Sequence, residues 1–254
     1  MTVGELADAV REAESVVAFT GAGVSTASGI PDFRSEGGIW ETHDRADFRY
    51  DRFRRDPAGF WADRLALQET MYGGTEPEPN AAHEALVGLA VDGHLDAVVT
   101  QNVDGLHADA AAAAGIDLEL VELHGNARAV ACIDCGEQFD AGPAFDRARA
   151  GERPPTCQEC GGVLKPCVIL FGERLDTATI ERARALARRA DVLLATGSSL
   201  TVEPAASLPR LAGRTGATLA VVNLTETPYS DAAEVDLRAD VTEALPALRA
   251  ALRD

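Results

Sequence analysis

The sequence predicts a doubly wound α/β fold whose sheet domain is interrupted by two insertions. Short apolar runs alternate with helical stretches along the chain, which is typical of a parallel sheet covered by helices. Two segments break this alternation, one rich in Arg, Asp and aromatic residues and one that carries two cysteine pairs. The length of 254 residues and the hydrophobic content of 46% suit one large domain with a small insertion.

The predicted elements follow these runs in chain order. Buried strands are expected where apolar and β-branched residues cluster, at 15–20, 95–100, 118–123, 192–196 and 217–222, and a further extended run covers 165–170. Helices are expected at 80–91, 105–114, 177–189 and 242–253, and 36–74 is expected to be mostly helical. Pro79-Asn80 marks the start of the first of these helices, and Gly115 marks the end of the second.

Polar residues follow the predicted strands at 95–100 and 118–123 at the point where each strand ends. Gln101-Asn102-Val103-Asp104 follows the first strand and His124 the second. Ligands bind at the carboxyl ends of strands in open α/β sheets, so we expect Asn102, Asp104 and His124 to form a reaction centre at one edge. His124 is the expected general base, because imidazole titrates near working pH. A lone histidine at a strand end is otherwise more often structural.

The other histidines are weaker candidates. His83 and His94 are expected on helix surfaces. His107 lies one helical turn after Asp104 and is expected to support the site without binding a ligand.

Gly21-Ala22-Gly23-Val24-Ser25 follows the first predicted strand and is a candidate phosphate-binding loop. Glycines let the backbone approach a pyrophosphate, and N–H groups at a helix start favour its negative charge. The spacing is not G-x-G-x-x-G, so a tight strand-to-helix turn is equally compatible with it. Ile30-Pro31-Asp32-Phe33-Arg34 strengthens the case, because an Arg and an Asp beside a glycine turn can close over a dinucleotide. A generic loop with an ion pair is the alternative.

Two C-x2-C pairs, Cys132/Cys135 and Cys157/Cys160, are separated by 21 residues. Four thiolates at this spacing suit a tetrahedral Zn²⁺ ion. Because sulfur fills all four positions, the zinc is expected to be structural and not catalytic. Two disulfides or a redox pair are the alternative, and the expected cytoplasmic location argues against disulfides. Cys167 is left over and is expected to be a small buried apolar residue.

The formal net charge is −18, and Lys165 is the only lysine among 23 basic residues. An acidic excess with almost no lysine predicts a salt-adapted, halophilic protein, because a Debye length of about 3 Å at 1 M salt screens the self-repulsion. An acidic protein from a GC-rich genome, which also favours Arg over Lys, is the alternative. No basic stripe points to direct nucleic-acid binding, whereas a basic peptide would be attracted.

The chain has no run of 18 or more apolar residues, and its first residues lack the basic and apolar regions of a signal peptide. We therefore expect no membrane partner and a cytoplasmic location. No oligomeric state is predicted.

The apolar run at 165–170 leads into Phe171-Gly172-Glu173. An extended run with an exposed edge can pair with a substrate peptide by strand addition. An ordinary core strand has the same pattern, so both interpretations stay open.

Together these residues resemble the sirtuin family of NAD-dependent protein deacylases. The matching motifs run in family order across nearly the whole chain, at 21–25, 29–34, 100–107, 123–125, the two cysteine pairs, 171–173, 197–200 and 222–223. The resemblance implies a discontinuous Rossmann-like NAD-binding domain (1–35, 75–128 and 168–254), a helical insertion (36–74) and a zinc-binding small domain (129–167). An acylated-lysine protein or peptide would enter the cleft between the NAD and zinc domains.

The resemblance also implies which residues bind the ligands. NAD would contact Gly21, Ala22, Gly23, Ser25, Thr26, Ile30, Pro31, Asp32, Phe33, Arg34, Trp40, Gln101, Asn102, Val103, Asp104, Gly197, Ser198, Ser199, Asn223, Leu224 and Val241. The substrate would contact Trp61, Arg64, Val168, Phe171, Gly172 and Glu173. One structural Zn²⁺ would be held by Cys132, Cys135, Cys157 and Cys160.

The implied reaction removes an acetyl group from protein lysine and gives nicotinamide and O-acyl-ADP-ribose. Asn102 and Asp104 would orient the ribose and the nicotinamide amide, and His124 would deprotonate a ribose hydroxyl after the acyl oxygen has attacked. Mono-ADP-ribosyl transfer from the same NAD site is an alternative. A zinc-bearing NAD or ADP-ribose sensor without turnover is disfavoured, because the base and both ribose-orienting residues are present. A dehydrogenase is disfavoured because the first loop lacks a third glycine.

Three positions depart from the family pattern. Ser198 stands where Thr is usual and keeps the hydroxyl, and Cys167 stands where Asp or Asn is usual. Trp61-x-x-Arg64 stands where members that remove succinyl or malonyl groups have Tyr-x-x-Arg. The guanidinium suited to a carboxylate is present, but the Tyr hydroxyl is missing. We expect plain deacetylation, with lysine desuccinylation or demalonylation as the alternative.

Overall fold

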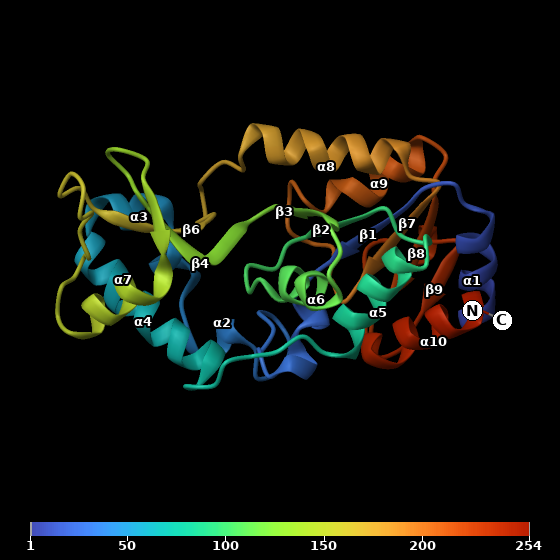
Figure 1. Ribbon diagram of the computed structural model, residues 1–254, viewed down its shortest axis with the longest axis horizontal. Coiled ribbons are helices and arrows are strands. Elements are labelled where there is room, and N and C mark those ends of the chain that lie inside the picture. The colour runs from blue at the N-terminus through green and yellow to red at the C-terminus, as the bar shows by residue number, and fades with distance from the viewer. Residues whose placement is uncertain (1, 254) are drawn as a thin grey trace.

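The computed structural model describes residues 2–253. Within them, six parallel strands form the central sheet in the order β3-β2-β1-β7-β8-β9 (Figure 1). These strands are β1 (Val16–Thr20), β2 (Ala97–Thr100), β3 (Glu119–Glu122), β7 (Val192–Thr196), β8 (Thr218–Val222) and β9 (Val235–Leu237). The strand order reverses between β1 and β7, which is the switch point of a doubly wound sheet. The predicted Rossmann-like α/β fold is confirmed.

Helices cover both faces of this sheet. Val16 and Ala18 of β1 face one side, which is covered by α1 (Val3–Glu12), α5 (Ala81–Val91) and α10 (Val241–Arg253). Val17 and Phe19 face the other side, which is covered by α8 (Thr177–Arg189) and α9 (Ser207–Arg214). α6 (Leu106–Ala114) packs against α5. Because both faces are buried there, the inner strands β1, β2, β7 and β8 are continuous apolar runs, whereas the edge strands β3 and β9 include Glu119, Glu122 and Asp236.

A second lobe lies beside the sheet domain, at the left of Figure 1. Its helices are α2 (Ile39–Thr42), α3 (Tyr50–Arg55), α4 (Pro57–Tyr72) and α7 (Ala141–Arg149). Its antiparallel sheet has the order β5-β4-β6, with β4 (Gly125–Cys132), β5 (Gln138–Asp140) and β6 (Leu164–Val168). The helical excursion and the cysteine segment share one hydrophobic cluster, in which the ring centroids of Trp61 and Phe145 are 5.1 Å apart.

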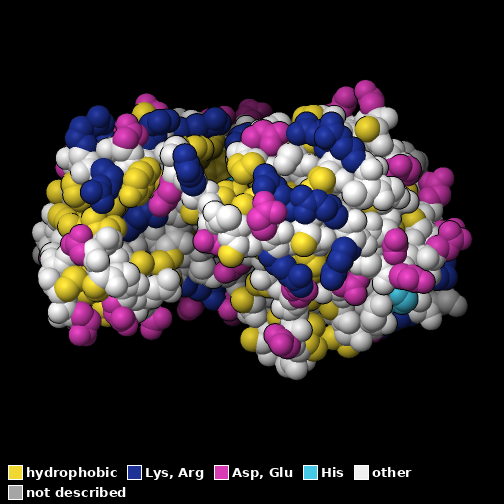
Figure 2. Space-filling model, turned by 90° about the horizontal axis from the view of Figure 1, so that it is seen from above, with side chains coloured by type: hydrophobic (Ala, Val, Ile, Leu, Met, Phe, Trp, Pro, Cys, Tyr) yellow, Lys and Arg dark blue, Asp and Glu magenta, His cyan; other side chains and the backbone are white. Residues whose placement is uncertain are grey.

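Short 3₁₀ helices complete the architecture. η1 (Ala22–Val24) and η2 (Thr26–Ser28) follow β1, η3 (Arg45–Phe48) precedes α3, and η4 (Ser230–Ala232) precedes β9. Among residues 2–253, no helix has the length and apolar character that a bilayer span needs. Seen from above, the surface is hollowed between the two lobes, and hydrophobic side chains line this groove (Figure 2).

Candidate functional site

The loops after β1 and β7 touch through their backbones at the switch point. Gly23 N donates to the Gly197 carbonyl over 2.8 Å. A Cβ on Gly21 would lie 2.8 Å from Ser198 Cβ, and a Cβ on Gly23 would lie 2.9 Å from the Gly197 oxygen. Loop-to-loop packing therefore requires both glycines of the first loop. It also places the start of η1 beside 197–199, where dinucleotides bind in such sheets.

Several backbone donors of these two loops have no partner within residues 2–253. The N–H groups of Ala22, Ser198 and Ser199 make no hydrogen bond to the described part of the chain. Unsatisfied N–H groups at the start of a helix and in a glycine turn suit phosphate oxygens. The loops therefore fit the pyrophosphate of a dinucleotide.

The segment from Ile30 to Trp40 is a structured loop. Asp32 Oδ1 accepts hydrogen bonds from the backbone N–H groups of Arg34 (2.7 Å) and Ser35 (2.8 Å). Burial raises the pKa of Asp32, but the hydrogen bonds from Ser35 and Arg34 outweigh it and hold the pKa below its ordinary value. Asp32 thus shapes this turn through backbone contacts. The ring centroid of Trp40 lies 5.3 Å from that of Phe33 and 5.6 Å from that of Phe171. Trp40 therefore links this loop to the second lobe.

Four buried polar side chains meet below the first glycine loop. Ser25 Oγ donates to Asp104 Oδ2 over 2.8 Å and accepts from Asn102 Nδ2 over 3.1 Å. His83 Nε2 lies 3.5 Å from the same hydroxyl. The predicted pair of Asn102 and Asp104 is therefore fixed by a serine of the glycine loop. Such a satisfied network holds its members in one geometry.

The expectation that His83 and His94 lie on helix surfaces is wrong. His83 is 0% exposed, and burial lowers its pKa to about 4, so the ring is neutral at pH 7. His83 stands three residues after the N-cap Asn80, and its Nδ1 accepts from Asn80 N over 3.3 Å. This capping-box spacing was the signal that sequence analysis missed. His94 lies half-buried in the turn after α5.

His107 supports Asn102 through two threonine hydroxyls. Its Nε2 lies 2.9 Å from Thr20 Oγ1, which lies 2.7 Å from Thr100 Oγ1. Thr100 Oγ1 in turn accepts from the backbone N–H of Asn102 over 3.0 Å. Burial lowers the pKa of His107 to about 3, so this ring is neutral as well. This chain of hydrogen bonds from His107 through Thr20 and Thr100 fixes the backbone of Asn102, where β2 ends.

His124 lies in the turn between β3 and β4. Its Nδ1 is 3.0 Å from the Gln101 carbonyl oxygen. A carbonyl only accepts hydrogen bonds, so Nδ1 carries the proton and Nε2 presents a lone pair. Burial lowers the pKa of His124, and the bond to Gln101 opposes this shift in part. Gln101 Nε2 donates to Ser198 Oγ over 2.9 Å. Gln101 therefore connects His124 to the loop 197–199 after β7, the second glycine loop.

The remaining cofactor candidates lie at or near the same edge of the sheet. Asn223 follows β8, and its Nδ2 donates to the Thr225 carbonyl over 2.9 Å. Leu224 is 70% exposed, which is unusual for a leucine beside a buried sheet. Val241 begins α10 and is buried in the cluster that includes Val24. Thr26 Oγ1 donates to the Gly23 carbonyl over 3.1 Å and so closes the first loop.

The segment Val168–Glu173 is bonded to its neighbours on several sides. Ile169 N donates to the His124 carbonyl over 2.9 Å. Phe171 N donates to the Phe48 carbonyl and Phe171 O accepts from Tyr50 N, each over 3.0 Å. Leu170 N donates to Glu173 Oε2 over 2.9 Å. The backbone of Phe171 is therefore already paired within the chain, and the Glu173 carboxylate faces its own segment.

Trp61 and Arg64 both point into the second lobe. Trp61 is 0% exposed, and its Nε1 donates to the Leu164 carbonyl over 2.9 Å. Arg64 is also buried, and its guanidinium carbon lies 5.9 Å from the centre of the Phe145 ring. Its Nε has no hydrogen-bond partner among residues 2–253. Burial lowers the pKa of Arg64. Trp61 thus belongs to the core, whereas Arg64 is a buried cation that the described chain leaves incompletely bonded.

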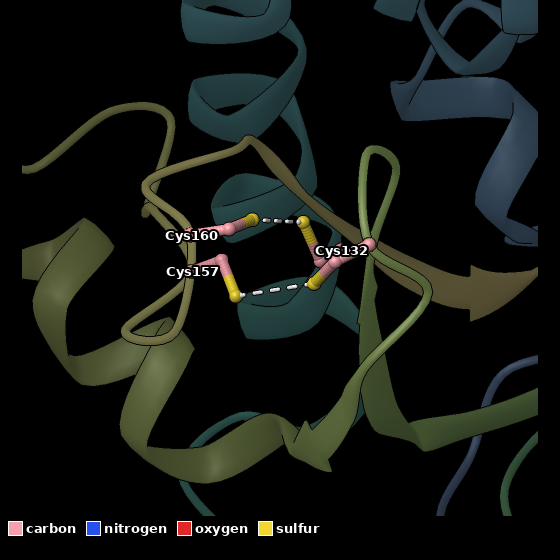
Figure 3. A group of neighbouring side chains, drawn as sticks. Cys132, Cys157 and Cys160 are labelled. Atoms are coloured by element: carbon pink, nitrogen blue, oxygen red, sulfur yellow. Dashed lines mark hydrogen bonds between the residues drawn. The ribbon is translucent and has the colours of Figure 1, made fainter.

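The four predicted zinc ligands converge in the second lobe, and Figure 3 labels three of them, Cys132, Cys157 and Cys160. The sulfur atoms of Cys132, Cys135, Cys157 and Cys160 all lie within 4.8 Å of one another. Cys132 and Cys160 Sγ are 3.4 Å apart, and Cys135 and Cys157 Sγ are 3.8 Å apart. A disulfide needs about 2.05 Å, whereas zinc–sulfur bonds of about 2.3 Å hold tetrahedral sulfurs at about such separations. The cluster therefore fits one Zn²⁺ ion.

The fifth cysteine stands apart from this cluster. Cys167 is half-buried, where the sequence predicts a buried residue. Burial raises the pKa of its thiol. It therefore stays a neutral thiol at pH 7.

The fold and the site define a dinucleotide-binding α/β protein with a metal-binding lobe. A family model described as the Sir2 family matches residues 21–204. The chain is 56% identical to an NAD-dependent protein deacetylase of Haloarcula marismortui, over 97% of this chain and 93% of that protein. It is 41% identical to an NAD-dependent protein deacylase of Aeropyrum pernix, over 95% and 94%. A solved Sir2 structure with deacetylated p53 peptide and 3'-O-acetyl-ADP-ribose matches with a TM-score of 0.88 at 35% identity, over 97% and 96%. The chain belongs to the Sir2 family.

Proposed function

We propose that this protein removes acetyl groups from protein lysine with NAD as co-substrate and gives nicotinamide and O-acyl-ADP-ribose. The observation that carries the proposal is the tautomer of His124, whose Nε2 is an unprotonated base at the ligand-binding edge of the sheet. Relatives named NAD-dependent protein deacetylase support the activity. A solved Sir2 complex with p53 peptide and NAD+, 34% identical to this chain, supports a peptide substrate.

The proposed roles follow from the bonding of each residue. When bound, NAD supplies the ribose carbon that accepts the acyl oxygen and releases nicotinamide. The N–H groups of Ala22, Ser198 and Ser199, which have no partner within residues 2–253, hold its phosphates. Asn102 and Asp104, fixed by Ser25, orient the ribose and the nicotinamide amide. His124 Nε2 takes the proton of a ribose hydroxyl, because Nδ1 is already committed to Gln101.

The remaining assignments belong to the same proposal. The four-cysteine zinc is structural, because sulfur fills its coordination sphere. The 1–35, 75–128 and 168–254 segments form the NAD domain, 36–74 the helical insertion and 129–167 the zinc domain. The net charge of −18 and a relative from a halophilic archaeon support function at high salt. The protein acts in the cytoplasm without a nucleic-acid or membrane partner.

The test is a nicotinamide-release assay with an acetyl-lysine peptide in molar KCl, followed by product mass spectrometry. We expect deacetylated peptide and free O-acetyl-ADP-ribose in equal amounts. An ADP-ribosylated peptide would instead establish mono-ADP-ribosyl transfer from the same site. Absence of NAD-dependent nicotinamide release would refute both activities.

Desuccinylation or demalonylation is the second candidate function, and the bonding of Arg64 favours it. A buried guanidinium is stabilised by a carboxylate, and none of the ion pairs within residues 2–253 involves Arg64. The carboxylate of a succinyl or malonyl group would supply that partner. The test compares kcat/KM for acetyl- and succinyl-lysine peptides in wild type and in Arg64→Met. A succinyl preference that Arg64→Met removes would establish this activity, and equal loss with both peptides would refute it.

A further inference from the structure

Lys165, the only lysine of the chain, is held inside the second lobe. Its side chain is 12% exposed. Its Nζ donates to the Val168 carbonyl over 2.7 Å and to the Pro166 carbonyl over 3.2 Å. The third contact is an ion pair with Glu173 Oε2 at 3.0 Å. Three oxygen atoms therefore converge on an ammonium group that has three N–H donors.

This geometry explains why one position keeps a lysine when the other basic residues are arginines. An ammonium is a compact point charge that can donate in three directions from one atom. A guanidinium presents its donors in a planar fork, which suits a single carboxylate better than two carbonyls and a carboxylate oxygen around one point. The chemistry at Lys165 thus overrides the preference of this sequence for arginine.

Two of the three contacts connect the ends of the segment Val168–Glu173, and the third is to Pro166, which precedes it. Val168 begins the segment, and the Glu173 carboxylate that ends it also accepts from Leu170 N over 2.9 Å. Between these points, Ile169 N donates to the His124 carbonyl over 2.9 Å. The ammonium therefore links the two ends of the segment Val168–Glu173, an arrangement that we call the Lys165 clip. This segment is bonded directly to the backbone of the general base His124.

We propose that Lys165 is a positioning residue, which sets the segment Val168–Glu173 in the conformation that receives the acyl-lysine peptide. This inference rests on the proposed function, because it takes that segment as the peptide site. Without the ammonium, the Glu173 carboxylate loses its charged partner and the Val168 carbonyl loses a donor inside a partly buried site, which costs more than at the surface. The hydrogen bonds and the ion pair of Lys165 all go to Pro166, Val168 and Glu173 and none to the glycine loops that hold NAD, so we expect NAD binding not to depend on it.

The experiment compares the full-length variant Lys165→Met with wild type in molar KCl. Methionine keeps the apolar stem and removes the ammonium. We expect KM for the acetyl-lysine peptide to rise about tenfold while KM for NAD stays within twofold. Arg184→Met is the matched control, because it breaks an exposed ion pair with Glu181 on α8 and is expected to change neither KM. Zinc content and melting temperature are measured for each variant.

Lys165→Arg separates the charge from the geometry. We expect an intermediate peptide KM, because the charge is kept but three-way donation is not. Equal rises in both KM values together with a lower melting temperature would show a purely structural role and overturn the proposal. An unchanged peptide KM in Lys165→Met would overturn it as well.

Glu173→Gln tests the same clip from the other side and is used if Lys165→Met fails to fold. The amide oxygen can still accept from Leu170 N, but the ion pair is lost. We expect the same selective rise in peptide KM, and an unchanged value would overturn the proposal. A wild-type enzyme that releases no nicotinamide from NAD would refute the proposed function itself, which keeps the two failures distinct.

Discussion

Three neutral imidazoles with different tasks lie close to one edge of the sheet. Burial lowers the pKa of His83, His107 and His124 below the ordinary value of 6.5. His83 faces the hydroxyl of Ser25. His107 supports the backbone of Asn102 through hydrogen bonds with Thr20 and Thr100. His124 differs from the other two because it is partly exposed, and because its bond to the Gln101 carbonyl leaves Nε2 as an acceptor that a ligand can reach. The base is therefore identified by its hydrogen bond and not by its pKa alone.

Replacing His124 with alanine is expected to abolish turnover and leave NAD binding nearly intact. A general base contributes about 10²–10⁴-fold to the rate, whereas the glycine loops that hold NAD keep their own contacts. The measurements are the rate of nicotinamide release with acetyl-lysine peptide and the NAD dissociation constant by calorimetry. His94→Ala, in the turn after α5, is the matched control and should retain full activity. A His124→Ala enzyme with a third of the wild-type rate would contradict the assigned role.

The buried histidines also predict how the free energy of unfolding depends on pH. The folded-state pKa values of about 4 for His83 and about 3 for His107 lie below the ordinary 6.5 of the unfolded chain. Between pH 6.5 and 4 the unfolded state binds protons that the folded state excludes, so stability falls as pH falls, by up to about 1.4 kcal/mol per pH unit for each group. The hydrogen bonds of Asp92 with Arg249 and Arg253 hold its pKa well below the ordinary 3.8, so its contribution is lost only at lower pH.

Chemical denaturation in 2 M KCl at several pH values between 4.5 and 7 measures this dependence. His107→Gln is expected to reduce the slope relative to wild type, because glutamine removes one titrating group while keeping a partner for Thr20. His94→Gln serves as the control. A slope that is the same in His107→Gln and wild type would mean that His107 titrates normally in the folded state.

The sequence predicted some of these side chains well and others poorly, for a physical reason. Asn102, Asp104 and His124 directly follow apolar strands, so their place at the sheet edge could be deduced from the chain alone. His83 lies on α5, far from Ser25 in the sequence, and only the folded structure brings the two side chains together. The glycines of the first loop suggested a ligand, but contact with Gly197 already requires them.

At the scale of elements, the helices and strands with the clearest local sequence pattern were the ones predicted correctly. The helix Thr177–Arg189 and the strand Val192–Thr196 have the bounds that the sequence predicted. α1, α7 and α9 were missed. α9 contains Pro209 and Gly213, which weaken a helical pattern, and α7 lies among the Gly and Pro clusters of the cysteine segment. α1 carries a capping box of Thr2 and Glu5 that gave a usable signal.

The shared core of the second lobe limits what sequence can say about domains. β4 begins at Gly125, before the predicted boundary at 129, and the helical excursion packs on the cysteine segment through Trp61 and Phe145. Contacts between segments far apart in the chain leave no local pattern. The boundaries therefore stay a prediction.

Zinc removal is expected to disorder the second lobe and abolish peptide deacetylation. Cys132 and Cys157 are buried members of the same core as Trp61 and Phe145, so losing the ion removes a crosslink inside that core. Cys157→Ser should lose about one zinc per chain and most of its activity. Cys167→Ser should keep both, because Cys167 lies outside the four-sulfur cluster. Metal analysis and nicotinamide release measure the two effects, and full activity in zinc-free Cys157→Ser would contradict a structural role.

At the scale of the whole molecule, the net charge of −18 is the dominant electrostatic feature. In dilute buffer this charge destabilises the folded state through self-repulsion, and molar salt screens it over about 3 Å. The melting temperature is therefore expected to rise between 0.1 and 2 M KCl. Differential scanning calorimetry at both concentrations tests this, with the same KCl activity used for the enzyme assay. A melting temperature that does not rise would show that the acidic composition is no adaptation to salt.

The placement of aromatic residues gives the molecule a built-in optical signal. Both tryptophans of the chain, Trp40 and Trp61, pack in the second lobe. Trp61 is enclosed against Phe145, whereas Trp40 is half-buried and contacts Phe33 of its own segment and Phe171. Tryptophan emission thus reports on this lobe alone, while far-ultraviolet circular dichroism is dominated by the larger sheet domain. One titration followed by both methods can separate unfolding of the lobe from unfolding of the sheet, and quenching of Trp40 can follow a peptide as it binds.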